Sequence, residues 1–218
     1  MTENKVTPQL VLNAYASGIF PMADSRNDPE IFWVDPEQRG ILPLDQFHIP
    51  RSLRKLVKQE KFDIKIDTAF RDVVRACAAT SGERDGTWIS REIEDLYCDL
   101  HNHGFTHSVE CWFEGNLVGG LYGVALASGF FGESMFHTKT GASKVALVHL
   151  VARLIAGGFT LLDTQFGTVH LAQFGVIEIS RKAYHEQLEA ALDHTANFQK
   201  LPVGLSGSTI LQLITQTS

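Results

Sequence analysis

The sequence predicts an α+β fold in which helices cover both faces of a mixed β-sheet. Two helices precede three apolar strands joined by short turns, which is the pattern of an antiparallel meander. An almost wholly apolar helix, a further strand and a final helix follow. With 218 residues, 44% of them hydrophobic, the chain can bury a sizeable core.

The N-terminal residues 1–62 predict a small α+β domain. Apolar side chains recur at helical spacing over residues 7–18. Residues 31–34 and 40–43 read as short strands, each limited by a proline. A proline in the first turn favours a helix over residues 50–60.

Residues 63–195 are expected to form a larger domain, and residues 196–218 a C-terminal tail without a clear pattern. The expected elements of the larger domain are helices over residues 68–79 and 90–104, strands over 105–113, 117–126 and 130–136, a helix over 142–156, a strand over 159–163 and a helix over 180–193.

Composition and charge exclude several classes of protein. The net charge of -6 argues against indiscriminate nucleic-acid binding, although it allows a local basic patch. No apolar run approaches the roughly 20 residues of a transmembrane helix, and no secretory leader is evident, so we expect a cytoplasmic protein. Cys77, Cys98 and Cys111 are odd in number and form no CxxC pair, which favours free thiols.

One short helix concentrates positive charge in this acidic chain. Arg51, Arg54, Lys55 and Lys58 recur at helical spacing over residues 50–60. This pattern is typical of a solvated helix face, and it equally suits a stripe that binds nucleic-acid phosphates.

Polar side chains end two otherwise apolar strands. Glu133 lies near the end of the third strand of the meander, and Asp163 and Gln165 follow the next strand along the chain. Strand alternation places Asp163 and Gln165 on one side and Thr164 on the other. Buried carboxylates carry a desolvation cost, so these residues predict a functional site. The alternative is that one carboxylate only pairs with a lysine, such as Lys144, or with a helix N-terminus.

Other candidate sites are weaker. The spacing of His101, His103 and His107 does not match a metal site, and we expect no bound metal. The segment around Ser134 lacks the second glycine of a nucleophile elbow, so a serine hydrolase is disfavoured. Gly119, Gly120 and Gly123 lie inside a strand, where glycine marks either a close ligand or backbone or plain close packing.

A set of motifs together resembles one known family. In chain order they are YASGIFP (15–21), FW (32–33), RGILP (39–43), TWI (87–89), HSVE (107–110), GGLYG (119–123), GESMF (132–136), SK (143–144) and DTQ (163–165). They closely resemble the bacterial leucyl/phenylalanyl-tRNA–protein transferases over about residues 10–192.

The resemblance implies an enzyme that moves leucine or phenylalanine from aminoacyl-tRNA onto the N-terminal Arg or Lys of a protein. Such transfer marks the protein for degradation. The resemblance also implies that the larger domain has a GNAT-like acetyltransferase fold. We further expect no cofactor and a monomer. The acetyl-CoA loop pattern of the GNAT superfamily is missing from this sequence.

The resemblance also assigns roles to residues. It implies that Gln165 is catalytic, that Asp163 polarises its amide, and that Glu133 binds the N-terminus of the peptide. Trp88 resembles the aromatic residue that stacks on the terminal adenine. The implied pocket for the aminoacyl side chain is formed by Leu121, Phe130, Met135, Leu150, Leu154 and Leu162. Arg51, Arg54 and Lys55 correspond to the basic region for the tRNA acceptor stem, and Thr168 stands where the family often has Asn.

Two alternatives remain. One is an acyl-CoA-dependent N-acyltransferase on the same fold, and the other is a non-enzymatic module that binds N-degrons or tRNA.

Overall fold

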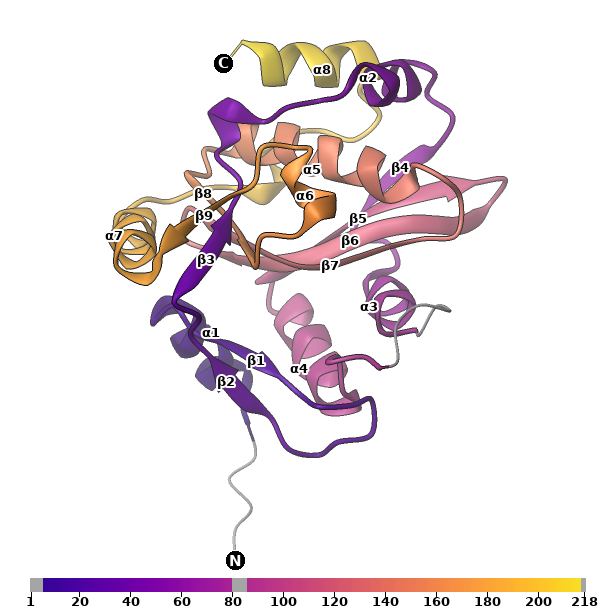
Figure 1. The fold of residues 1–218 in the computed structure, drawn as a ribbon. Helices are drawn as coiled ribbons and strands as arrows, with labels where there is room; N and C mark the ends of the chain where they lie inside the picture. The colour runs from indigo at the N-terminus through magenta and orange to yellow at the C-terminus, as the bar shows by residue number, and fades with distance from the viewer. Residues whose placement is uncertain (1–5, 80–85, 217–218) are drawn as a thin grey trace, which may run out of the picture.

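The computed structural model describes residues 6–79 and 86–216, and within them it contains two β-sheets. A two-stranded antiparallel sheet of β1 (Phe20–Met22) and β2 (Phe32–Val34) lies beside helix α1 (Pro8–Ala16). The second sheet has seven strands in the order β4-β5-β6-β7-β8-β3-β9. The α+β class and the mixed sheet are therefore confirmed (Figure 1).

The strands of the large sheet are β3 (Gln38–Ile41), β4 (Asp63–Ile66), β5 (Thr106–Phe113), β6 (Asn116–Leu126), β7 (Gly129–His137), β8 (Leu161–Gln165) and β9 (Ile177–Ser180). The remaining helices are α2 (Arg51–Lys58), α3 (Phe70–Ala78), α4 (Arg91–Asn102), α5 (Ala142–Gly157), α6 (Val169–Ala172), α7 (Arg181–Leu192) and α8 (Gly207–Thr215). Strands β7 and β8 pair in parallel, and the other recorded pairs are antiparallel.

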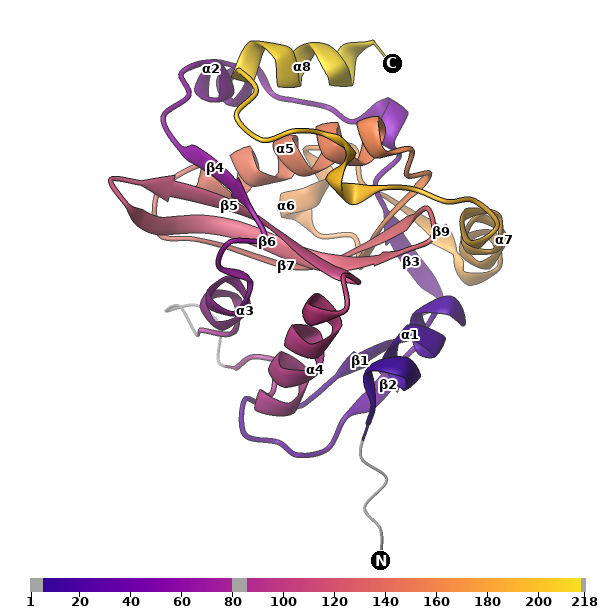
Figure 2. The ribbon, with the colours of Figure 1, turned by 180° about the vertical axis from the view of Figure 1, so that it is seen from behind.

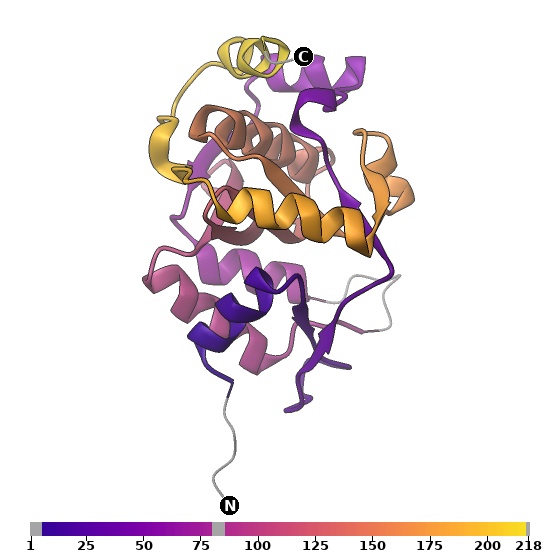
Figure 3. The same ribbon diagram turned by 90° about the vertical axis from the view of Figure 1, so that its left-hand side faces the viewer.

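Helices cover both faces of the large sheet. Helix α5 lies on one face, and α2 and α8 cover its outer side (Figures 1 and 2). Helices α1, α3 and α4 lie on the other face, and Figure 3 shows α7 along the edge between the two layers. Two hydrophobic clusters fill these layers, one centred on α5 and the other on α1, α3, α4 and α7.

Local sequence signals explain where several elements begin and turn. The Thr7 and Ser90 side chains accept hydrogen bonds from backbone N–H groups in the first turns of α1 and α4. Glu114 and Gly115 both have positive φ, of 51° and 76°, which suits the tight turn between β5 and β6.

The glycines of β6 serve close packing. A Cβ at Gly119 would lie 2.5 Å from the Cβ of Ala142, at the start of α5. At Gly123 it would lie 2.3 Å from the carbonyl oxygen of Phe131 in β7. The structure therefore supports close packing against a side chain at Gly119 and close approach of a neighbouring backbone at Gly123.

Several short elements were absent from the sequence-based expectations. Strands β1, β4 and β9 and helices α6 and α8 were not predicted, and the strand expected over residues 40–43 is β3, at Gln38–Ile41. Strand β3 pairs with β8 and β9, so the chain enters the large sheet well before residue 62. The division into 1–62, 63–195 and 196–218 remains a proposal.

A buried carboxylate organises the start of α3. Glu110 of β5 is fully buried and accepts from the backbone N–H groups of Thr68 and Ala69, both at 2.8 Å. It also accepts from the hydroxyls of Thr68 and Ser108 and from the indole N–H of Trp112. Because these donors surround the carboxylate, its burial is compensated.

Replacing Glu110 with Ala is expected to lower the free energy of unfolding by about 3 kcal/mol, because it leaves buried N–H donors without an acceptor. Urea denaturation of the variant and of the exposed control Glu189→Ala measures the effect. A loss no larger than in the control would contradict this account.

Candidate active site

The candidate site begins where two neighbouring strands part. Strands β7 and β8 pair only over Gly129–Phe131 and Leu161–Asp163, and both continue beyond the last pair. A pocket of about 450 Å³ lies at this divergence and is lined by residues of both strands. The parting of a parallel strand pair therefore creates an opening in the middle of the sheet.

Gln165 sits in an unusual turn at the end of β8. The pairing of β3 with β8 joins Gly40 to Gln165 and Ile41 to Asp163, so Thr164 is an extra, bulged residue. Gln165 has φ 56°, and the N–H of Phe166 donates to the Thr164 carbonyl at 2.6 Å. Such an i to i+2 turn with positive φ is a strained geometry that concentrates at functional sites.

The bulge changes where the side chains lie. The expectation of strict alternation over residues 163–165 does not hold, because Thr164 is bulged; Thr164 and Gln165 both line the pocket. Gly40 makes the turn possible, since a Cβ there would lie 2.5 Å from the carbonyl carbon of Phe166.

Asp163 is fully buried and paired with Arg39. The Nη2 and Nε atoms of Arg39 donate to the carboxylate at 2.6 and 3.0 Å, and the Tyr184 hydroxyl donates at 2.8 Å. The backbone N–H of Gln165 donates to Oδ1 at 2.7 Å. Asp163 thus contacts Gln165 through the backbone, whereas the resemblance implied a contact to the side-chain amide.

Arg39 was missed as a site residue. It is 1% exposed, its guanidinium lies 4.5 Å from the Phe20 ring centroid and 4.4 Å from that of Tyr184, and it donates to the Gly18 carbonyl at 3.0 Å. The available signal was a charged residue directly before the apolar run of residues 40–44, together with the need of Asp163 for a counter-charge. Lys144, the partner considered from the sequence, instead donates to Gln173.

Glu133 lies among neutral donors. The Tyr15 hydroxyl donates to Oε1 at 2.7 Å, the Tyr97 hydroxyl to Oε2 at 3.0 Å, and the Gln165 side-chain amide to Oε1 at 3.3 Å. Burial raises the pKa of Glu133 to about 7, although the two tyrosines and Arg39 oppose this rise. A cation in the pocket would therefore favour the ionised form.

Tyr15 and Tyr97 were not predicted as site residues. Their hydroxyls lie 2.6 Å apart, and burial, followed by the charge of Glu133, raises the pKa of both well above 10. They are therefore neutral donors that hold both oxygens of the carboxylate. In the sequence they appeared as ordinary apolar positions of helices.

The apolar wall of the pocket differs in part from the predicted set. Leu121, Met135, Leu150 and Leu162 line the pocket, whereas Phe130 and Leu154 are fully buried in the core and do not. Further apolar lining residues that were not predicted are Phe20, Met22, Leu42, Leu147, Phe166 and Leu171.

Two further predicted residues lie on the pocket wall. Trp88 lines the pocket together with Phe20 and Met22. Thr168 also lines it, and its hydroxyl accepts from the Leu171 N–H at the start of α6. The Thr168 hydroxyl is therefore partly committed to capping a helix.

The basic helix α2 lies apart from the pocket. Leu53 and Val57 are buried, and α2 packs against α5 and α8. Arg51 and Lys55 are exposed, Arg54 is half-buried, and none of the three lines the pocket. Their contact with tRNA remains a prediction.

A second group of arginines surrounds Glu94, which is 4% exposed. Arg26, Arg71 and Arg75 all pair with its carboxylate. Arg26 also donates to the carbonyls of Ile89 and Ser90, next to Trp88. The sequence pattern did not reveal this cluster, because its members come from three separate segments.

The described residues contain no group of three or more His, Cys, Asp or Glu side chains that could hold a metal ion. Within them, His101 and His103 contact backbone carbonyls and His107 contacts Asp67. Cys77, Cys98 and Cys111 are all buried, and Cys98 and Cys111 are free thiols. No helix in the described ranges has the length and apolar character needed to cross a membrane.

Comparison with known proteins gives consistent matches over nearly the whole chain. The family profile "Leucyl/phenylalanyl-tRNA protein transferase" matches residues 41–189, and the profile of its N-terminal domain matches residues 4–37. A solved structure, that of L-PGS from Bacillus licheniformis, covers 94% of this chain and 68% of its own at 14% identity, with a TM-score of 0.40, too low to support an argument.

Curated relatives carry the name leucyl/phenylalanyl-tRNA–protein transferase. The Phenylobacterium zucineum protein is 58% identical over 95% of this chain and 96% of its own length. Those of Paramagnetospirillum magneticum and Maricaulis maris are 59% and 55% identical, over 89% and 95% of this chain and 93% and 96% of their own lengths. On these matches, the chain belongs to the leucyl/phenylalanyl-tRNA–protein transferase family.

Proposed function

We propose that this aminoacyltransferase moves leucine or phenylalanine from aminoacyl-tRNA to proteins that begin with Arg or Lys. The observation that carries the proposal is the contact between Glu133 and Gln165, which both line a pocket whose other walls are largely apolar. An apolar wall suits the aminoacyl side chain, and a carboxylate beside it suits a cationic N-terminal residue.

The reaction is the aminolysis of an ester. The α-amine of the acceptor attacks the ester carbonyl, the new peptide bond forms, and the ester oxygen of the terminal adenosine leaves and takes up a proton. An α-amine of pKa about 7.7–8.0 is about one-tenth to one-sixth unprotonated at pH 7, so no strong base is needed. Positioning of the two substrates therefore supplies much of the rate.

Gln165 acts in this scheme by orienting the amine. Its side-chain N–H is held by Glu133, which leaves the amide oxygen free to accept a hydrogen bond from the attacking amine. A neutral amide is a very weak base, so the proton leaves through the ribose hydroxyls or water. The strained turn at Gln165 supports a precise placement of this group.

The two carboxylates divide their tasks. Asp163 is saturated by Arg39, Tyr184 and the Gln165 N–H, so it positions the turn and does not act as a base. Glu133 has no basic side chain in direct contact among the described residues, so its charge is available to a cationic substrate. Trp88, on the same pocket, would stack on the terminal adenine, a contact worth about 1–3 kcal/mol.

Three finer points belong to the proposal. The transfer creates an N-terminal leucine or phenylalanine that directs the acceptor to proteolysis. The enzyme works as a monomer in the cytoplasm, where aminoacyl-tRNA is made. The exposed cations of α2, Arg51 and Lys55, together with the half-buried Arg54, contact tRNA phosphates.

The direct test incubates the purified chain with labelled leucyl-tRNA and a peptide that begins with Arg. Label is expected to enter this peptide and a Lys-initiated one, but not a matched peptide that begins with Asp. Transfer of an acetyl group from acetyl-CoA to the same peptide, or binding without transfer, would contradict the proposal.

Glu133→Gln is expected to raise the KM for an Arg-initiated peptide about tenfold or more, because a charge-assisted contact is lost. The KM for leucyl-tRNA is expected to change little. Steady-state kinetics with each substrate varied in turn measures both values, and Glu189→Gln is the matched control. Equal loss for both substrates would argue against the assigned role.

The affinity for the Arg-initiated peptide is expected to depend on pH differently in the unsubstituted enzyme and in Glu133→Gln. Because the pKa of Glu133 is about 7, its ionised fraction and hence peptide affinity rise between pH 6 and 8 in the unsubstituted enzyme. This rise is expected to flatten in Glu133→Gln.

Gln165→Ala is expected to lower kcat about 100-fold with little change in the KM for leucyl-tRNA, since the amine loses its orienting acceptor. Gln165→Glu places a second carboxylate beside Glu133 and is also expected to be slower. A faster Gln165→Glu enzyme at neutral pH would mean that proton abstraction limits the rate, which overturns the orienting role.

A further inference from the structure

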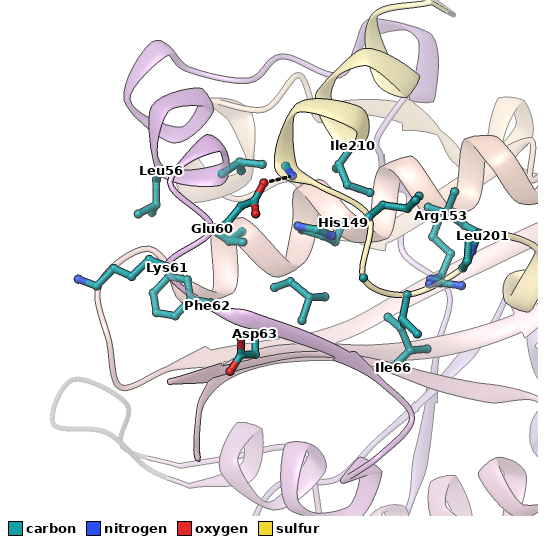
Figure 4. Close-up of a pocket in the computed structure, with 18 residues that line it drawn as sticks. Leu56, Glu60, Lys61, Phe62, Asp63, Ile66, His149, Arg153, Leu201 and Ile210 are labelled. Carbon is teal, nitrogen blue, oxygen red and sulfur yellow. Dashed lines mark hydrogen bonds between the residues drawn. The ribbon is translucent and has the colours of Figure 1, made fainter. Parts of the chain in front are cut away.

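A second cavity lies on the other side of helix α5 from the active-site pocket. Leu147 and Leu150 of α5 line the active-site pocket, whereas Val145, His149 and Arg153 line this second cavity, of about 200 Å³. Its other walls come from α2, from β4 and from the segment between Leu201 and Ile210 (Figure 4). The two cavities share no lining residue.

Arg153 is a buried cation without a buried anion beside it. The residue is 3% exposed, and none of the ion pairs found among the described residues includes it. Its Nη1 donates to the Phe198 carbonyl at 2.8 Å, and its guanidinium lies 5.3 Å from the Phe198 ring centroid. Its buried Nε has no hydrogen-bond partner within the described chain.

This burial has an electrostatic consequence. Burial lowers the pKa of Arg153, and the charge of Asp67, which is not in contact with it, only partly opposes this shift. An unpaired cation in a low-dielectric interior carries a penalty of several kcal/mol, which an anion with good geometry offsets. A guanidinium presents two parallel donors that match a carboxylate.

His149 adds a second donor. It precedes Arg153 by one helical turn, so both side chains lie on one face of α5 and enter the same cavity (Figure 4). Burial and the charge of Arg153 lower the pKa of His149 to about 4. The imidazole is therefore neutral at pH 7 and can donate one N–H to an anion.

The remaining walls define the rest of the ligand. They are formed largely by the aliphatic side chains of Leu56, Val57, Ile64, Ile66, Val145, Leu201, Leu205 and Ile210. Glu60 and Asp63 also line the cavity, and the Glu60 carboxylate caps the start of α8 at the Gly207 N–H. These two acids disfavour multiply charged ligands, and Lys61 offsets only one of them.

We propose that this cavity is a ligand site for a short aliphatic carboxylate, whose carboxylate group is held by Arg153 and His149. The cavity volume of about 200 Å³ limits the ligand to a small molecule. The branched five-carbon acid isovalerate, which combines a carboxylate with a short aliphatic part, serves as the probe. Its apolar part would cover the aliphatic wall, whereas an inorganic anion would leave that wall exposed to water.

The first test uses the unsubstituted protein with methyl-labelled isoleucine. Titration with isovalerate is expected to shift the methyl signals of Ile64, Ile66 and Ile210, which line the cavity, and to leave those of Ile89 and Ile93 in place. Absence of these shifts, or equal shifts at the distant residues, overturns the proposal.

The second test compares ligands and variants by calorimetric titration and thermal unfolding. Isovalerate is expected to bind at least about tenfold more tightly than its neutral amide or inorganic phosphate, and Arg153→Met is expected to remove this preference. Arg91→Met is the control, because it removes an exposed arginine outside the cavity, and this variant is expected to retain the preference for isovalerate.

Each other outcome is informative. If isovaleramide binds as tightly as isovalerate, the cavity recognises only the aliphatic part of the ligand. If phosphate binds more tightly than isovalerate, the cavity is an inorganic anion site. Either result overturns the assignment. If Arg153→Met does not fold, the methyl titrations of the unsubstituted protein with the acid and with the amide decide the question. The aminoacyl-transfer assay is independent of all these measurements.

Discussion

The buried ion pair between Arg39 and Asp163 is the interaction on which the candidate site depends. It joins β3 to β8, and through the Gly18 carbonyl and the Phe20 ring it ties the N-terminal unit to the large sheet. Asp163 also accepts the backbone N–H of Gln165, so the pair holds the strained turn in place. Removal of either partner would leave a buried charge, at a cost of about 3–5 kcal/mol.

The same strand ends place two carboxylates in contrasting surroundings. Asp163 faces a guanidinium, whereas Glu133 is held by two tyrosine hydroxyls and an amide. Neutral donors compensate a buried charge less completely than a cation does, and the pKa of Glu133 accordingly rises to about 7. Where β7 and β8 part, the fold thus holds a carboxylate that has no cationic partner in contact among the described residues, and a bound cation would compensate its charge.

Strong periodicity and strand order made much of the fold predictable. The meander and the apolar helix α5 were evident because their patterns run for many residues. Strands β4 and β9 have four residues each, and β3 enters the sheet between β8 and β9, from far away in the sequence. Neither propensity nor periodicity encodes such a pairing, because tertiary contacts decide it.

The site shows the same division between local and distant information. The polar ends of β7 and β8 pointed to Glu133, Asp163 and Gln165, and these residues do lie together. Arg39, Tyr15 and Tyr97 escaped notice because their contacts span 124, 118 and 36 positions of the chain. Phe130 and Leu154 could not be distinguished from pocket residues, since a core and an apolar pocket require the same side chains.

The bulge at Thr164 explains why the residue at position 165, two positions after the ion-paired Asp163, is an uncharged glutamine. In a regular strand the side chain at 165 would continue the alternation, but the positive φ of Gln165 turns it to within 3.3 Å of Glu133. A carboxylate there would repel Glu133 and favour protonation of one of the two. An amide instead donates its N–H to Glu133 and keeps a carbonyl oxygen for the substrate, so the strained backbone and the neutral side chain are parts of one arrangement.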